Sequence, residues 1–154
     1  MAALSDVCDF LRQGRLAVVG VSRNPNDFTR GLFREFVNRG YDVVPVHPGV
    51  AEIEGRPCFS HVQEISPPVE GALLLTSPTV TSAVVRDCAE AGVNHVWMYR
   101  AAGAGSISSE ALALCESQGI GGVAGECPYM FFPSAGFPHT WHACARKILG
   151  RYPR

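Results

Sequence analysis

Residues 16–29 read LAVVGVSRNPNDFT and carry the clearest signal of the fold class. The run from Leu16 to Val19 is apolar without alternation and stops at Gly20, which is typical of a parallel strand buried on both faces. Apolar residues then recur at helical spacing, and the pattern ends at Gly40. These residues are Phe28, Leu32, Phe33, Phe36 and Val37. The stretch therefore predicts a strand, a turn and a helix, which begin a βαβ unit.

The same alternation continues along the rest of the chain. Further strands are expected at 42–46, 71–76, 93–99 and 120–124, and further helices at 4–13, after Ser77-Pro78, after Ser108 and from Pro138. Pro45 has no amide hydrogen to donate, so its strand is expected at an edge or near its own end. Strands that alternate with helices indicate an α/β fold, a doubly wound parallel sheet of the Rossmann type, and one domain over residues 1–154.

Composition and charge exclude several classes of function. Thirteen basic residues against 14 acidic ones give a net charge of −1 without a basic cluster, so neither nucleic acid nor a membrane is an expected partner. No apolar run approaches the ~20 residues of a membrane span, and residues 1–15 do not resemble a signal peptide. The six cysteines are scattered and form no C-x-x-C, which favours free thiols in the cytoplasm over a disulfide framework.

The turn after the first strand is the expected ligand site. Ligands of doubly wound sheets bind outside the carboxyl ends of the strands. A dinucleotide fingerprint would need glycine at Ser22 and Pro25, and an acidic residue where His47 ends the second strand. An NAD(P)-binding sensor or oxidoreductase is therefore disfavoured. Arg23, Arg30 and the turn's amides and hydroxyls still suit a phosphate at the helix N-terminus.

A series of short motifs extends outward from this turn. They are G-x-S-x-x-P-x-x-x-T at 20–29, GYDVVPVHP at 40–48, E-I-x-G at 52–55, Ser77-Pro78, and G-x-x-x-V-W at 92–97. Together they resemble the small CoA-binding proteins, a Rossmann-type family related to the CoA-binding domain of the succinyl-CoA synthetase alpha subunit. The likeness spans roughly residues 16–125, whereas residues 126–154 look like a branch of their own.

The resemblance implies a ligand and a set of binding residues. The ligand is coenzyme A or an acyl-CoA, a small nucleotide held at the carboxyl edge of the sheet, with no catalysis by the chain expected. Phosphates are placed at Gly20–Arg23 and Thr29, and the nucleotide end against His47-Pro48 and Ser77-Pro78. The full set expected to bind the cofactor is Gly20, Val21, Ser22, Arg23, Pro25, Thr29, Arg30, His47, Pro48, Ser77, Pro78 and Val80.

Plainer roles compete with these assignments. Ser22 and Thr29 belong to residue types that fill turns and helix caps everywhere, and His47 could be structural. Asp27 stands where many relatives carry a basic residue.

A second interpretation concerns the segment after the last strand. Cys127 follows that strand, and His139 and His142 form an i, i+3 pair on the last expected helix. The three residues could form a thiolate–imidazole pair, part of a metal site with Glu126, or only packing. No metal-binding spacing or nucleophile signature is present, so packing is favoured and no metal ligand is assigned. A cysteine-dependent enzyme that uses Cys127 with His139 or His142 remains the alternative to CoA binding.

Overall fold

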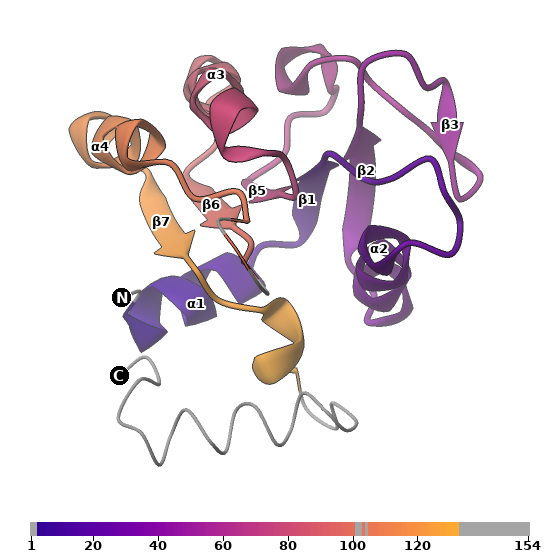
Figure 1. Ribbon diagram of the computed structural model, residues 1–154, viewed down its shortest axis with the longest axis horizontal. Coiled ribbons are helices and arrows are strands. Elements are labelled where there is room, and N and C mark those ends of the chain that lie inside the picture. The colour runs from indigo at the N-terminus through magenta and orange to yellow at the C-terminus, as the bar shows by residue number, and fades with distance from the viewer. Residues whose placement is uncertain (1–2, 101–102, 104, 133–154) are drawn as a thin grey trace.

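A five-stranded parallel sheet forms the centre of the molecule (Figure 1). The computed structural model describes residues 3–100, 103 and 105–132. The strands of the sheet are β1 (Arg15–Val19), β2 (Asp42–Val46), β5 (Gly71–Leu74), β6 (His95–Met98) and β7 (Gly121–Ala124). Their order is β2-β1-β5-β6-β7, and every neighbouring pair is parallel. The expected doubly wound sheet is confirmed, and β2, which carries Pro45, lies at its edge as expected.

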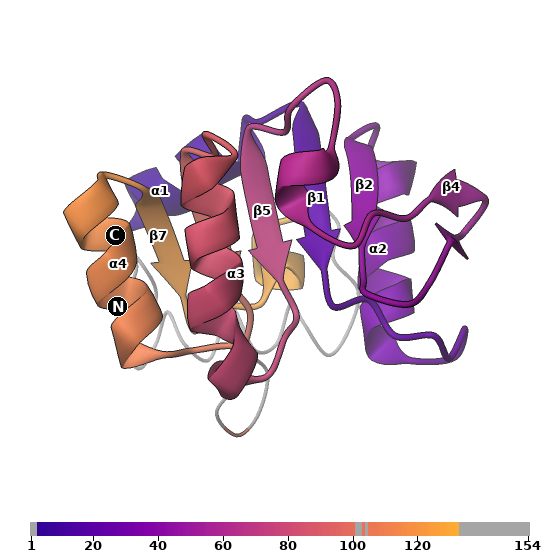
Figure 2. The same ribbon diagram turned by 90° about the horizontal axis from the view of Figure 1, so that it is seen from above.

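Helices cover both faces of the sheet (Figures 1 and 2). One face carries α1 (Leu4–Leu11) and α2 (Phe28–Asn38), and the other carries α3 (Pro78–Glu90) and α4 (Ser109–Gln118). Strand β1 shows why the apolar run has no gaps. Leu16 and Val18 belong to the core cluster beneath α1 and α2, whereas Ala17 and Val19 belong to the cluster beneath α3 and α4. A strand buried on both sides needs an apolar side chain at every position.

Local sequence sets where the helices begin. The Asp27 carboxylate accepts a hydrogen bond of 2.8 Å from the Thr29 amide and caps α2, and the Ser108 hydroxyl caps α4. Ser77 occupies the corresponding position before α3, with Pro78 first in the helix, but its side chain makes no capping bond. Its hydroxyl lies 3.0 Å from Thr79 Oγ1 instead. The N-terminus of α3 therefore lacks a side-chain acceptor of its own.

The connection from β2 to β5 differs from the other crossovers because it contains no α-helix. It holds a hairpin of β3 (Glu52–Ile53) and β4 (Arg56–Pro57), and then the short 3-10 helix η1 (Val62–Glu64). A second 3-10 helix, η2 (Pro128–Met130), follows β7. Elements of two or three residues are too short to show a periodic pattern in sequence, so none of them was expected. The helix expected from Pro138 lies outside the described residues.

The direction of the crossovers reverses at β1. From β1 the chain passes through α2 to β2, which is the neighbour of β1 at one edge of the sheet. Strands β5, β6 and β7 extend the sheet from β1 in the other direction, and their connecting helices α3 and α4 cover the opposite face. The carboxyl ends of β1 and β5 therefore flank the point of reversal, where open α/β sheets bind ligands.

Candidate functional site

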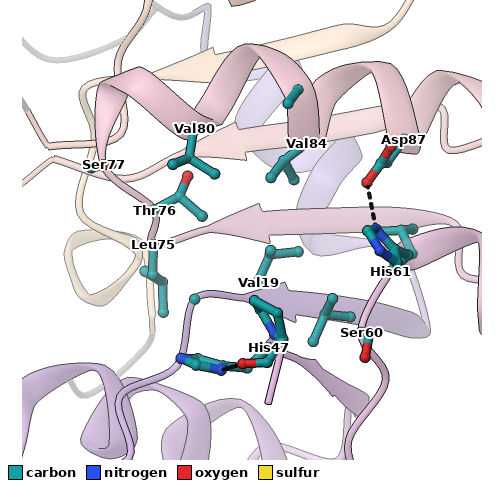
Figure 3. Close-up of a pocket in the computed structure, with 15 residues that line it drawn as sticks. Val19, His47, Ser60, His61, Leu75, Thr76, Ser77, Val80, Val84 and Asp87 are labelled. Atoms are coloured by element: carbon teal, nitrogen blue, oxygen red, sulfur yellow. Dashed lines mark hydrogen bonds and ion pairs between the residues drawn. The ribbon is translucent and has the colours of Figure 1, made fainter. Parts of the chain in front are cut away.

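A cavity of about 360 Å³ opens at this point of reversal. The strand ends form its floor, α3 forms one wall, and the loop before η1 forms the other (Figure 3). The strand ends contribute Val19, Gly20, Val46, His47, Pro48, Leu75 and Thr76. The walls contribute Ser60 and His61 from the loop, Val62 from η1, and Ser77, Val80, Ala83, Val84 and Asp87 from the α3 side. Apolar side chains dominate the middle of this cavity, and polar groups stand at its two ends.

One face of α3 lines the cavity. Val80, Val84 and Asp87 follow Ser77 at steps of three or four residues, so all four lie along the same side of the helix (Figure 3). The uncapped helix N-terminus at Ser77 carries a partial positive charge, and Asp87 carries a negative charge at the other end. An anionic group is therefore favoured near Ser77, and a hydrogen-bond donor near Asp87.

Hydroxyl groups organise the Ser77 end. Thr81 Oγ1 donates to the Ser77 carbonyl at 3.0 Å and lies 2.9 Å from Thr76 Oγ1. Because the Thr81 proton is engaged by the carbonyl, Thr76 must donate to Thr81. The Thr76 oxygen can therefore only accept a hydrogen bond from a ligand.

The loop wall is tied to α3 at the opposite end. His61 Nδ1 lies 3.2 Å from Asp87 Oδ2, as the dashed line in Figure 3 shows. Gln63 Nε2 donates to Asp87 Oδ1 and to Glu90 Oε2, each at 2.9 Å. These bonds fix the position of the loop relative to the helix at the Asp87 end, and the cavity lies between the two beyond that contact.

His47, directly after β2, is held by Phe59 of the β2–β5 connection and by the neighbouring Pro48. Its amide donates to the Phe59 carbonyl at 2.9 Å, and its Nδ1 lies 2.7 Å from the Pro48 carbonyl. Because a carbonyl only accepts, this contact places the proton on Nδ1. When the ring is neutral, Nε2 remains an acceptor.

The turn at 20–29 closes on itself through hydrogen bonds. The Ser22 amide donates to Thr29 Oγ1 at 2.9 Å, and Thr29 Oγ1 donates to Asp27 Oδ1 at 2.5 Å. The hydrogen bonds from the Thr29 hydroxyl and amide lower the pKa of Asp27. Ser22 and Thr29 therefore hold the turn together. Arg23 is exposed and forms no hydrogen bond or ion pair with any described residue.

The cavity contains only part of the expected binding set. Gly20, His47, Pro48, Ser77 and Val80 line it. The remaining members lie in the neighbouring turn or in the helices and do not line it; they are Val21, Ser22, Arg23, Pro25, Thr29, Arg30 and Pro78. The Val21 side chain is fully buried in the core beneath α1 and α2, so only its backbone could meet a ligand.

Sequence reasoning missed the loop wall and most of the α3 face. The helical spacing of Val80, Val84 and Asp87 is visible in sequence and could have extended the set along α3. Ser60 and His61 give no such signal, because they lie in a connection without periodicity.

The Cys127 segment is part of the packed interior. The residue is only 7% exposed, and burial, the largest influence, raises the pKa of its thiol. A raised pKa keeps the thiol protonated near neutral pH, which works against a thiolate nucleophile. His139 and His142 lie outside the described residues.

The described residues show neither a metal-ion cluster nor a membrane-spanning helix. They contain no group of three His, Cys, Asp or Glu residues that could hold a metal ion. They also contain no helix with the length and apolar character needed to cross a membrane.

Comparison with known proteins gives a family match over most of the chain. The model of a family described as "CoA binding domain" matches residues 14–133. An uncharacterized protein of Bacillus subtilis, YneT, is 25% identical over 108 residues, which cover 70% of this chain and 77% of that protein.

Solved structures share the fold. A hypothetical protein from Pyrococcus horikoshii has a TM-score of 0.74 and 27% identity, with 80% of this chain and 85% of that chain covered. A dinucleotide-forming acetyl-coenzyme A synthetase from Ca. Korarchaeum cryptofilum has a TM-score of 0.61 and 23% identity. That match covers 70% of this chain and 25% of the synthetase, and at this identity it shows the fold alone.

Proposed function

This chain belongs to the CoA-binding domain family, and we propose that it binds coenzyme A or an acyl-CoA at the carboxyl edge of its sheet. The observation that carries the proposal is the cavity of about 360 Å³ between the ends of β1 and β5 and the uncapped N-terminus of α3.

The two ends of the cavity suggest the orientation of the ligand. The pyrophosphate lies at the Gly20–Arg23 turn and the N-terminus of α3, where backbone amides and a partial positive charge favour an anion. The adenine ring fills the apolar middle, with its exocyclic amine toward the Asp87 end, because a carboxylate accepts from an amine.

The residues proposed to contact the ligand come from both regions. They are Gly20, Val21 through its backbone, Ser22, Arg23, Pro25, Thr29, Arg30, His47, Pro48, Ser77, Pro78 and Val80, with Thr76, His61 and Asp87 added from the cavity wall. The chain is proposed to bind without catalysis, and the buried, protonated Cys127 thiol supports this reading.

The test is a comparison of coenzyme A with NAD by isothermal titration calorimetry. Coenzyme A is expected to bind at least about tenfold more tightly, a difference of about 1.4 kcal/mol in binding free energy. His47 in place of a ribose-binding acid is the reason, since an acid there would repel the 3′-phosphate of coenzyme A. Removal of that phosphate, or added salt, is expected to weaken binding. Equal or tighter binding of NAD would overturn the proposal in favour of a dinucleotide site.

A further inference from the structure

The tip of the hairpin β3–β4 has an unusual backbone. Glu54 has φ of +51° and Gly55 has φ of +72°. Glycine adopts this left-handed region without cost, but a glutamate does so only with strain. Among the non-glycine residues that the structure describes, Glu54 alone has a positive φ. Ile53 pairs with Arg56, so the two residues between them form a two-residue hairpin loop, a turn that requires a positive φ at both positions, and contacts of the glutamate elsewhere offset its strain there.

The Glu54 carboxylate makes those contacts with helix α2. Its Oε1 accepts from Arg30 Nε at 2.7 Å and from Arg34 Nη2 at 2.7 Å. The Arg30 side chain is only 13% exposed, so this cluster is partly shielded from water. The hydrogen bonds from Arg34 and Arg30 lower the pKa of Glu54 to about 2, so it is ionised at every physiological pH.

Both arginines also reach the turn at 20–25. Arg30 Nη1 donates to the Ser22 carbonyl at 3.2 Å, and Arg34 Nη2 donates to the Pro25 carbonyl at 3.1 Å. The turn is thus stabilised by its own hydrogen bond between the Ser22 amide and Thr29 Oγ1, and by the guanidinium groups of two helix residues. Those two groups meet at Glu54.

We propose that Glu54 is a positioning residue for the ligand-binding turn, acting through Arg30 and Arg34, which it orients onto the carbonyls of Ser22 and Pro25. The description of the turn as ligand-binding rests on the proposed function. The carboxylate keeps two like charges side by side and aims them at the backbone. Without it, the arginines repel each other and turn toward solvent, and both turn carbonyls lose their partners.

A simpler role for Glu54 makes the opposite prediction. If the carboxylate only neutralised the arginines, its removal would free two cations beside a polyanionic ligand. Binding of coenzyme A would then become tighter, with a steeper dependence on salt. The sign of the change in affinity therefore separates positioning from neutralisation.

The first variant is Glu54→Gln, which keeps the side-chain shape and removes the charge. Affinity for coenzyme A is expected to fall by about fivefold or more, because a loosened turn must be ordered on binding. In the ligand-free protein, hydrogen exchange of the Ser22 amide is expected to accelerate by a similar factor, while the amides of β5 and β6 are unchanged. Glu110→Gln is the matched control, since it breaks the exposed ion pair with Arg86 between α3 and α4 and touches no part of the turn.

The second variant, Glu54→Gly, separates positioning from stability. Glycine relieves the strained φ, which offsets part of the stability lost with the two ion pairs, so the melting temperature is expected to fall less than in Glu54→Gln, while affinity falls about as much. A purely structural role would predict affinity that follows stability.

The outcomes distinguish this inference from the proposed function. If the unaltered protein does not bind coenzyme A, the proposed function fails, and the exchange of the Ser22 amide still decides whether Glu54 positions the turn. If the protein binds and both Glu54 variants bind equally well or more tightly, with unchanged exchange at Ser22, the positioning role is overturned and the function stands.

Discussion

Gly20 meets two requirements that no other residue type meets together. Its φ is +89°, and a Cβ at this position would lie 3.1 Å from the carbonyl carbon and oxygen of Leu75. The first requirement concerns the conformation of the residue itself, and the second concerns the close approach of the ends of β1 and β5. Any side chain here would push apart the two strand ends that form the floor of the cavity.

A glycine elsewhere allows the two requirements to be separated. Gly40 has φ of +91°, but a Cβ there would meet nothing within 4 Å. Gly40→Ala is expected to cost roughly 1–2 kcal/mol of unfolding free energy through backbone strain and to leave coenzyme A binding intact. Gly20→Ala is expected to cost about 1 kcal/mol more and to weaken binding. Denaturant unfolding and calorimetry of both variants test this, and equal losses of stability would contradict the steric argument.

The alkylation rate of Cys127 shows whether the segment after β7 contains a reactive thiol. Burial raises the pKa of its thiol, so the thiolate fraction near neutral pH is small, and alkylation depends on the thiolate. Iodoacetamide is therefore expected to label Cys127 much more slowly than the exposed Cys8, as followed by peptide mass mapping. Cys127→Ala is expected to lower the unfolding free energy by about 1 kcal/mol and to leave coenzyme A binding nearly unchanged. Faster labelling of Cys127 than of Cys8 would restore the cysteine-dependent enzyme as the better interpretation.

A substitution on the cavity-lining face of α3 tests whether the ligand binds in the cavity. Val80 lines the cavity and is 47% exposed, so a polar replacement disturbs little of the core. Val80→Asp places a carboxylate close to the proposed phosphate position and in an apolar wall. Coenzyme A affinity is expected to fall by about tenfold or more through like-charge repulsion and desolvation, with stability changed by about 0.5 kcal/mol.

The control for Val80 lies on the next helix. Leu112 of α4 is 36% exposed and does not line the cavity, so Leu112→Asp is expected to leave affinity unchanged. A similar loss of affinity in both variants would show that the cavity is not where the ligand binds.

The elements also show how far sequence reasoning reaches. Strand β2 was predicted at 42–46 and occurs there, because buried strands give unbroken apolar runs. Helix α3 was predicted to follow Ser77-Pro78 and does, because a proline at the first helical position is a strong start signal. The strand expected at 93–99 is shorter, His95–Met98, because Val93 and Asn94 connect the turn after α3 to the strand and Tyr99 follows its end.

The candidate site was less accessible to prediction, for a physical reason. Periodicity indicates which residues share a strand or a helix face, but it does not indicate which loop packs against that face. His61 reaches Asp87 across 26 positions of the chain, and Glu54 reaches Arg30 across 24. Such contacts depend on the path of the β2–β5 connection, which contains no periodic element.

Two carboxyl groups with a lowered pKa contribute to the stability of the fold in acid. Glu54 has a folded-state pKa of about 2 against an ordinary 4.5, and the pKa of Asp27 is also lowered. A carboxyl group of this kind stabilises the fold fully above its ordinary pKa, and the contribution disappears as the pH falls through the folded-state value.

The resulting prediction compares the protein with Glu54→Gln across pH. The stability advantage of the unaltered protein is expected to be constant above about pH 5 and to shrink steadily as the pH falls from there toward about 2. Thermal unfolding at a series of pH values measures it. An advantage that grows on acidification would contradict the assigned ionisation of Glu54.

The connection from β2 to β5 has a consequence for how such a domain diverges during evolution. Its residues cross the sheet through a hairpin and a 3-10 helix, and Ile53, Val62, Ile65 and Val69 are its apolar side chains in the core. Ser60 and His61, in contrast, line the cavity and are exposed. Replacements at these two positions alter the shape and charge of the cavity and cost only the exposed His61–Asp87 contact and no core contact, so ligand preference is free to diverge while the fold is retained.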